Sequence, residues 1–187
     1  MLERQPASGL SLRGRTVPAF IAIEGPIGVG KTALARKIAE TFEYDLLLEE
    51  AEMNPFLERF YQNREQTALA TQLFFLFQRV QKITDIKQRD MFESTRVTDF
   101  ILEKDPLFAR VNLEPAEYAL YDKVYEKMHV EAPTPDLVIY LQANPERLLE
   151  RIGKRGIDAE QSIDRSYLEQ LNEVYSEFFL YYDAAPL

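Results

Sequence analysis

The sequence predicts an α/β protein with three layers, in which helices cover both faces of a parallel sheet. Segments typical of strands, such as the apolar run at residues 20–23 and the mainly apolar residues 136–141, alternate with segments of helical periodicity. The first run leads directly into GPIGVGKT, residues 25–32, which matches the GxxxxGK[ST] pattern at every fixed position. A strand, a glycine-rich loop and a helix in this order predict a phosphate-binding loop (P-loop).

Length and composition favour one domain. The chain has 187 residues, of which 46% are hydrophobic, so it can form one sizeable core. We expect a flexible tail over residues 1–17, for which a transit peptide is the alternative, and a single domain over residues 18–187. A helix and Ala184-Ala185-Pro186 precede the last residue at a point where this architecture ordinarily adds a strand. We therefore expect the C-terminal end to be incomplete.

The overall charge and the absence of cysteine restrict the partners. The formal net charge is −9, which argues against nucleic acids and membrane surfaces because both would repel the protein. No apolar run approaches the roughly 20 residues of a membrane span. The chain contains no cysteine, which excludes disulfides and thiolate sites and fits a cytoplasmic location. The expected partners are small molecules.

Each residue type in the P-loop has a physical role in holding a polyphosphate. Glycines let the backbone turn tightly enough for its N–H groups to point at phosphate oxygens. Lys31 supplies a mobile charge for the β- and γ-phosphates, Thr32 a hydroxyl for Mg²⁺, and the following helix a favourable dipole. The predicted nucleotide-binding residues are Gly25, Pro26, Ile27, Gly28, Val29, Gly30, Lys31 and Thr32.

Acidic residues follow two further predicted strands. Residues 41–50 contain an apolar run that ends in Glu49 and Glu50, which predicts a buried parallel strand with carboxylates at its C-terminal end, where ligands bind in such sheets. Glu49 is the expected general base; strand alternation points Glu50 the other way, although Glu50 as the base stays open. A weaker strand, residues 94–98, leads to Asp99, which we expect to hold Mg²⁺ beside Thr32.

A long helix is predicted from residue 54 to residue 86. It is apolar nearly all round, so it must be buried. Its large apolar residues are Leu69, Leu73, Phe74, Phe75, Leu76, Phe77 and Val80. One face of this helix can pack on the sheet. The apolar surface that remains predicts a homodimer formed through residues 65–83; a wholly internal helix is the alternative.

The last third of the chain predicts a mobile, basic lid. After a helix over residues 114–129 and the strand at 136–141, Asn144 and Pro145 are typical of a helix start, and this helix is expected to run to about residue 152. Arg151 and Arg155 then share one helical face beside two glycines, which predicts a lid over residues 151–163. A final helix is expected over residues 167–182.

The motifs narrow the enzyme class. There is no Asp-x-x-Gly switch after a strand and no Asn-Lys-x-Asp guanine reader, so a GTPase is excluded. A lone P-loop with guanidinium groups in a lid favours a small-molecule kinase, because planar guanidinium groups suit a transferring phosphoryl group.

Several ordered segments make the chain resemble the deoxynucleoside kinase family, in its bacterial deoxyadenosine/deoxyguanosine kinase branch, which is related to deoxycytidine kinase. They are IAIEGPIGVGKT, EEAEMNPFLERFY, TQLFFLFQR, TDFILEKDPLFA, PDLVIYLQANPERLLERI and RIGKRGIDAEQSI. The resemblance implies a P-loop kinase fold and ATP- and Mg²⁺-dependent phosphorylation of the 5′-hydroxyl of a deoxynucleoside. Deoxyadenosine or deoxyguanosine is the expected acceptor, in nucleotide salvage.

The same resemblance implies roles for individual residues. Glu49 corresponds to the acid that activates the 5′-hydroxyl. Lys31, Arg151 and Arg155 are expected to offset the negative charge of the phosphoryl group as it is transferred. The implied substrate-binding residues are Tyr61 near the sugar 3′-hydroxyl, Glu160 as its lid partner, Gln72 at the base edge, Arg79 on the same helix face, and Phe108 as the aromatic wall.

Two departures from the family pattern leave questions open. Many relatives carry an arginine directly after the acid where this chain has Asp99-Phe100, and either Arg96 or Lys104 could supply the missing cation. Ile157 stands where some relatives have a third lid arginine. A nucleoside monophosphate kinase of the thymidylate kinase type and a non-catalytic nucleotide-binding module remain alternatives, as do GTP as donor and a pyrimidine as acceptor.

Overall fold

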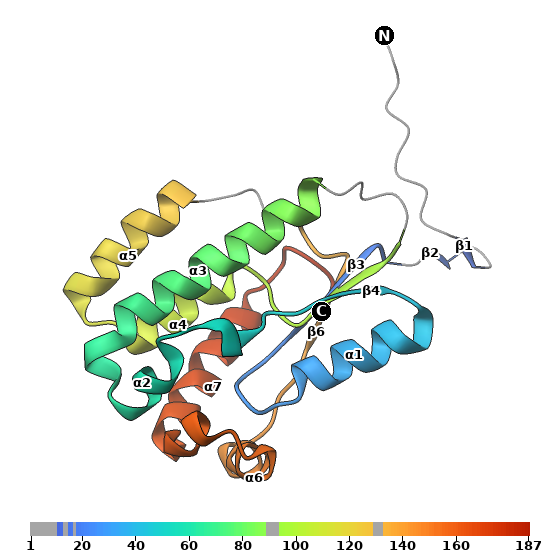
Figure 1. Ribbon diagram of the computed structural model, residues 1–187. Coiled ribbons are helices and arrows are strands. Elements are labelled where there is room, and N and C mark those ends of the chain that lie inside the picture. Colours follow the sequence, from blue (N-terminus) through green and yellow to red (C-terminus); the bar gives the residue numbers. More distant parts are fainter. Residues whose placement is uncertain (1–10, 13–14, 17, 89–93, 129–132) are drawn as a thin grey trace.

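A four-stranded parallel sheet forms the centre of the protein (Figure 1). The structure is a computed structural model that describes residues 11–12, 15–16, 18–88, 94–128 and 133–187. The strand order is β4-β5-β3-β6, with β3 at Phe20–Glu24, β4 at Asp45–Leu47, β5 at Arg96–Thr98 and β6 at Leu137–Tyr140. All three neighbouring pairs are parallel, which confirms the predicted sheet. Two further strands, β1 at Ser11–Leu12 and β2 at Arg15–Thr16, pair antiparallel within the predicted tail.

Helices cover both faces of the sheet, so the three-layer prediction is confirmed. The helices are α1 at Lys31–Phe42, α2 at Leu57–Gln62, α3 at Arg64–Gln88, α4 at Lys104–Asn112, α5 at Pro115–Met128, α6 at Pro145–Arg155 and α7 at Arg165–Leu180, with 3₁₀ turns at Ala51–Met53 and Asp158–Ser162. In Figure 1, α1 lies on one side of the strands, and α3, α4, α5 and α7 lie on the other. None of the helices in the described ranges combines the length and apolar character needed to cross a membrane.

The apolar run of the central strand β3 divides between the two faces. Ile21 and Ile23 pack with Ala35 of α1, whereas Ala22 packs with Tyr175 of α7 on the opposite face. Alternate residues of a strand point to opposite faces, so a strand covered on both sides must be apolar throughout. This requirement is why the run before the P-loop could be recognised from sequence.

The second predicted strand differs from the observed one. β4 is an edge strand, half-buried rather than buried, and it ends at Leu47, so that Glu49 and Glu50 lie in the loop that follows. The first part of the predicted strand belongs to the end of α1, which stops at Glu43 in a left-handed conformation (φ 57°). Glu50 also has a φ of 57°, so the extended conformation assumed for it does not persist.

Two helix predictions need correction, and one helix was missed. The helix predicted over residues 54–86 is two helices, because Asn63 adopts an extended conformation between α2 and α3. α6 continues through Gly153 to Arg155 and ends at Gly156, which is left-handed (φ 69°), so Gly153 does not interrupt it. Helix α4 was not predicted, because its first residues are charged and its apolar period is weak. The predicted helix end at His129 lies outside the described residues, whereas the predicted cap Asn144 does accept a hydrogen bond from the Arg147 N–H.

Candidate active site

The P-loop is pressed between the end of β6 and helix α6. A Cβ added to Gly25 would lie 2.3 Å from the Leu141 carbonyl oxygen, and one added to Gly28 would lie 2.8 Å from Cγ1 of Ile152. Both glycines also have positive φ angles, 147° and 80°, which other residues rarely adopt. The loop therefore needs glycine at these positions both for its backbone conformation and for its close packing.

Lys31 begins α1 and folds back over the loop. Its Nζ donates hydrogen bonds to the carbonyl oxygens of Gly25 at 2.7 Å and of Pro26 at 3.2 Å. Burial, with a further contribution from Lys104, lowers the pKa of Lys31 below its usual value. The ammonium group thus lies within the loop that the sequence predicted to hold phosphates.

Asp99 connects the P-loop helix to the loop that carries Glu49. Its Oδ2 accepts a hydrogen bond from the Thr32 hydroxyl at 2.5 Å, and its Oδ1 accepts one from the Glu49 backbone N–H at 2.8 Å. The carboxylate and hydroxyl are the hard oxygen donors that Mg²⁺ prefers. In the part of the chain that the structure describes, no group of three or more His, Asp or Glu side chains could hold a metal by itself. This donor set fits Mg²⁺, which usually takes few protein ligands and completes its shell with water and phosphate oxygens.

Glu49 is held between two cations. Its Oε1 accepts a hydrogen bond from Nε of Arg79 at 2.7 Å and pairs with the same guanidinium through Nη2, while its Oε2 lies 2.9 Å from Nζ of Lys104. Burial by itself raises the pKa of Glu49, but Arg79 and Lys104 together lower it to about 2. The carboxylate is therefore ionised at neutral pH and can accept a proton from a substrate hydroxyl. Glu50 pairs instead with Lys82 and is largely exposed, away from this cluster.

A second polar group lies on the other side of Arg79. Nη1 of Arg79 pairs with Oδ1 of Asp105, which is fully buried, and burial raises the pKa of Asp105 to about 6. Gln72 is also buried on α3, at 2% exposure. Among the described residues, neither Oδ2 of Asp105 nor Oε1 of Gln72 has a hydrogen-bond partner. Two buried polar atoms without protein partners indicate a place where a ligand or water can supply the hydrogen bonds.

The lid residues contact both the P-loop and the α2 side of the site. Nη1 of Arg151 donates a hydrogen bond to the Val29 carbonyl oxygen at 2.7 Å, and Arg155 pairs with Glu160 in the 3₁₀ turn that follows α6. Tyr61 of α2 is buried; burial raises its pKa, and Tyr167 and Glu160 add to the shift. The structure thus brings Tyr61, Glu160 and Arg155 together. Ile157, which stands where some relatives have a third lid arginine, is 45% exposed.

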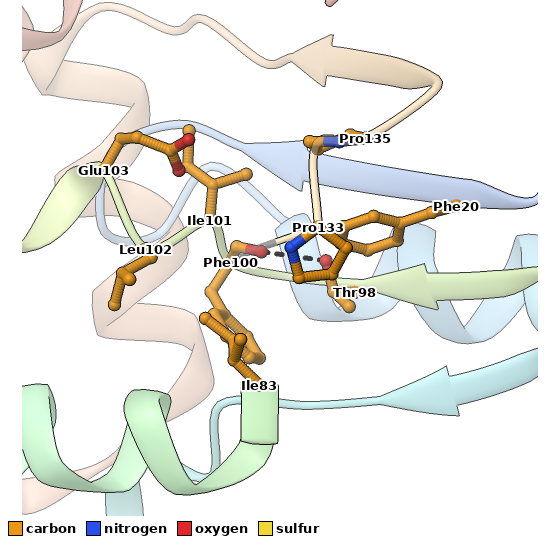
Figure 2. A pocket seen from close by; sticks show the side chains of 9 residues that line it. All are labelled: Phe20, Ile83, Thr98, Phe100, Ile101, Leu102, Glu103, Pro133 and Pro135. Carbon is orange, nitrogen blue, oxygen red and sulfur yellow. Dashed lines mark hydrogen bonds between the residues drawn. The ribbon is translucent and has the colours of Figure 1, made fainter. Parts of the chain in front are cut away.

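The structure separates the two candidates for the missing cation. Arg96 lies at the start of β5 and pairs with Asp45 at 3.9 Å, at the opposite end of the strand from Asp99. Lys104 lies within the cluster around Glu49. Phe100, directly after Asp99, is 2% exposed and extends toward Ile83 of α3 beside a small, mainly apolar pocket (Figure 2). None of the predicted site residues lines that pocket.

Phe108, predicted as an aromatic wall, is half-buried on α4. Its ring meets Tyr175 of α7 edge to face, with the centroids 6.0 Å apart. Sequence reasoning did not assign Asp105 to the site and left Lys104 as one of two options. Adjacent charges within the apolar stretch 100–109 were the available signal, since charged residues are seldom buried unless they are paired.

Comparisons with known proteins agree with this geometry. The family model described as deoxynucleoside kinase matches residues 21–187. A deoxyguanosine kinase of Bacillus subtilis is 38% identical over 157 residues, which cover 83% of this chain and 76% of the relative. A deoxyadenosine/deoxycytidine kinase of the same organism is 31% identical over 179 residues, covering 90% and 80% of the two chains. The structure of deoxyadenosine kinase from M. mycoides with bound dATP superposes with a TM-score of 0.78 at 29% identity, covering 89% of this chain and 91% of that one.

Proposed function

The chain belongs to the deoxynucleoside kinase family, and on that basis we propose that it transfers the γ-phosphoryl group of ATP to the 5′-hydroxyl of a purine deoxynucleoside. As a deoxynucleoside kinase it is a phosphotransferase with a hydroxyl acceptor, which serves nucleotide salvage. The purine preference is supported by the names of similar proteins, which include deoxyguanosine and deoxyadenosine kinases. The kinase domain is proposed to include residues 18–187 and to act in the cytoplasm.

The ionised, half-buried Glu49, held between Arg79 and Lys104, is the observation that carries this proposal. The proton of the 5′-hydroxyl passes to Glu49 as the hydroxyl oxygen bonds to the γ-phosphorus, and the bond between that phosphorus and the β–γ bridging oxygen breaks to release ADP. Arg79 and Lys104 keep the carboxylate ionised at neutral pH, so it can accept a hydrogen bond from the hydroxyl. The same pairing makes it a weak base, so the proton moves to it only as the new bond to phosphorus forms. A negative charge here would repel an acceptor that already carries a phosphate, which argues against the thymidylate kinase type of reaction.

The donor side is formed by the P-loop and the lid. Residues 25–32 cradle the phosphates, and Lys31, Arg151 and Arg155 provide positive charge around the transferring group. Thr32 and Asp99 would hold Mg²⁺, which when bound neutralises phosphate charge. The contact between Arg151 and the Val29 carbonyl already places this guanidinium against the P-loop.

The acceptor side lies between α2, α3 and α4. Gln72 and Asp105 offer hydrogen-bonding atoms without protein partners to the base edge, and Arg79 orients Asp105. Phe108 would contact the base, while Tyr61 and Glu160 would bind the sugar. The homodimer is proposed to form through α3, residues 65–83, where Phe77 is 52% exposed; Leu120 of α5, a helix that packs against α3, is 51% exposed.

The test is phosphorylation from radiolabelled ATP with each of the four common deoxynucleosides and, separately, with their monophosphates. We expect a purine deoxynucleoside to be the best acceptor and the monophosphates to be inactive. Glu49→Gln should lower kcat by about 10²- to 10⁴-fold, whereas the matched variant Glu50→Gln should leave kcat within about twofold. Normal turnover of Glu49→Gln would refute the assignment of the base.

A further inference from the structure

Lys104 is a buried cation that the proposed reaction leaves without a direct role. It is the first residue of α4 and is 2% exposed. Its Nζ lies 2.9 Å from Oε2 of Glu49 and 3.4 Å from Oε1 of Glu24, so it connects two carboxylates that come from different parts of the sheet edge. An ammonium group is buried at high cost unless it is paired in this way.

Glu24 is fixed more firmly than an ordinary ion-pair partner. It ends β3 and is fully buried. Its Oε2 accepts hydrogen bonds from the Gly25 N–H at 2.9 Å and from the Tyr175 hydroxyl at 3.0 Å, and its Oε1 accepts one from the Ile101 N–H at 3.1 Å. These donors belong to the P-loop, to α7 and to the segment that leads into α4. Glu24 is therefore a rigid anchor whose position does not depend on Lys104 alone.

The short segment from Asp99 to Lys104 holds Glu49 at two points. Asp99 accepts the Glu49 backbone N–H, and Lys104 binds the Glu49 carboxylate. Phe100, between them, has its side chain in the apolar core, as Figure 2 shows, and contributes no charge. One connection after β5 thus determines both where the backbone of Glu49 lies and how its carboxylate is oriented.

We propose that Lys104, anchored by Glu24, is a positioning residue that keeps the Glu49 carboxylate directed at the acceptor hydroxyl. The inference rests on the proposed role of Glu49 as the base. Glu24 acts through Lys104 and touches no substrate. Charged groups from several elements surround Glu49. They are Lys31 of α1, Arg79 of α3, Lys104 and Asp105 of α4, Asp99 after β5 and Glu24 at the end of β3.

Kinetic measurements can distinguish a role of Lys104 in orienting Glu49 from a purely structural role. If Lys104 only neutralises two buried carboxylates, its loss lowers the amount of folded protein but leaves the kcat of the folded enzyme unchanged. If it orients Glu49, its loss lowers kcat while the KM for ATP stays constant, because Lys104 pairs with Glu49 and Glu24 and is not part of the P-loop.

The experiment measures kcat, KM and the thermal unfolding midpoint with ATP and deoxyguanosine or deoxyadenosine. Lys104→Met should lower kcat by about tenfold or more with the KM for ATP changed by less than about twofold. Lys104→Arg should recover most of the loss, since it keeps the charge. Lys37→Met is the matched control: Lys37 lies on the exposed face of α1, where it pairs with Glu40, and its loss should leave kcat unchanged.

Glu24→Gln completes a double-mutant cycle. It should lower kcat by about threefold to tenfold in the parent and have little further effect in the Lys104→Met background, because Glu24 acts through Lys104. Additive losses, or an unchanged kcat in folded Lys104→Met, would overturn the inference. If Lys104→Met does not fold, the kcat values of Lys104→Arg and Glu24→Gln test the role of Lys104 instead. An unchanged kcat in Glu24→Gln would then overturn the inference.

Glu49→Gln, assayed in parallel, separates the two proposals. Full activity of Glu49→Gln would refute the base and with it the role of Lys104. An inactive Glu49→Gln together with a fully active Lys104→Met would refute only the role of Lys104.

Discussion

The hydroxyl of Thr32 donates a hydrogen bond to Asp99 at 2.5 Å, which joins the first turn of α1 to the end of β5. The two residues are 67 positions apart in sequence, yet they place a hydroxyl and a carboxylate side by side next to the P-loop lysine. These two oxygens are the proposed protein ligands of Mg²⁺.

Thr32→Val should raise the Mg²⁺ concentration needed for half-maximal activity and lower kcat, because it removes one of the two proposed oxygen ligands. We expect a loss of about tenfold or more in kcat at limiting Mg²⁺. Titration of activity with MgCl₂ measures this. Thr41→Val, at the exposed far end of the same helix, is the matched control and should behave as the parent. An unchanged Mg²⁺ requirement in Thr32→Val would contradict the metal assignment.

Asp105 should make the stability of the protein fall as the pH rises from about 4 to about 7. Its pKa is raised from 3.8 to about 6 by burial, so the native state binds more protons than the unfolded state in this window. The contribution is fully present below the unfolded pKa and is lost as the pH passes the folded value. Relative to Asp105→Asn, the parent should lose roughly 3 kcal/mol of unfolding free energy over this range.

Urea denaturation at pH 4, 5, 6 and 7 measures the Asp105 effect. Asp122→Asn, at an exposed position of α5, is measured in parallel as the control. A stability difference between Asp105→Asn and the parent that does not change with pH would contradict this prediction.

Two glycine substitutions should have opposite effects. Gly25→Ala places a Cβ 2.3 Å from the Leu141 carbonyl oxygen at a φ of 147°, and it should cost more than about 2 kcal/mol of unfolding free energy and weaken ATP binding. Gly153→Ala lies inside α6 with nothing within 4 Å of the new Cβ, and it should stabilise the protein by about 0.5–1 kcal/mol. Chemical denaturation compares them; equal effects would contradict the packing described for the P-loop.

Removing a lid guanidinium should reduce turnover more than substrate binding. Arg155→Met and Arg151→Met should each lower kcat by about tenfold or more, because planar guanidinium groups stabilise charge on the moving phosphoryl group. Arg165→Met is the control, since Arg165 pairs with Glu146 and Glu169 on the surface. Steady-state kinetics with saturating deoxynucleoside measures the change in kcat. If Arg151→Met and Arg155→Met had the same kcat as the control Arg165→Met, the lid guanidinium groups would have no role in turnover.

Phe77→Glu should disrupt the proposed homodimer. A charge at this exposed position of α3 would have to be buried in the interface, which is unfavourable without a partner. Phe42→Glu, equally exposed on α1, is the control and should stay dimeric. Light scattering coupled to size-exclusion chromatography gives the mass, and a monomeric parent would refute the dimer.

The sequence predicted best those features that depend on neighbouring residues. The P-loop and the Asn144 cap each arise within a few positions, and the strands β3 and β6 follow from continuous apolar runs. The edge position of β4 and the break at Asn63 depend on contacts distant in the chain, and they were missed. The same reason explains Asp105 and Lys104: both lie in the unpredicted helix α4, and their meaning comes from Arg79, Glu49 and Glu24, which no local pattern brings to them.

The terminal segment has a further consequence for solubility. Pro186 accepts a hydrogen bond from the Val138 N–H at 2.8 Å, and Ala185 is buried against the same face as α7, so this segment lies along the outer edge of β6. An uncovered edge of a parallel sheet offers backbone groups to which other chains can add, which leads to aggregation. A variant that ends at Asp183 would therefore be expected to precipitate at concentrations at which the parent stays in solution.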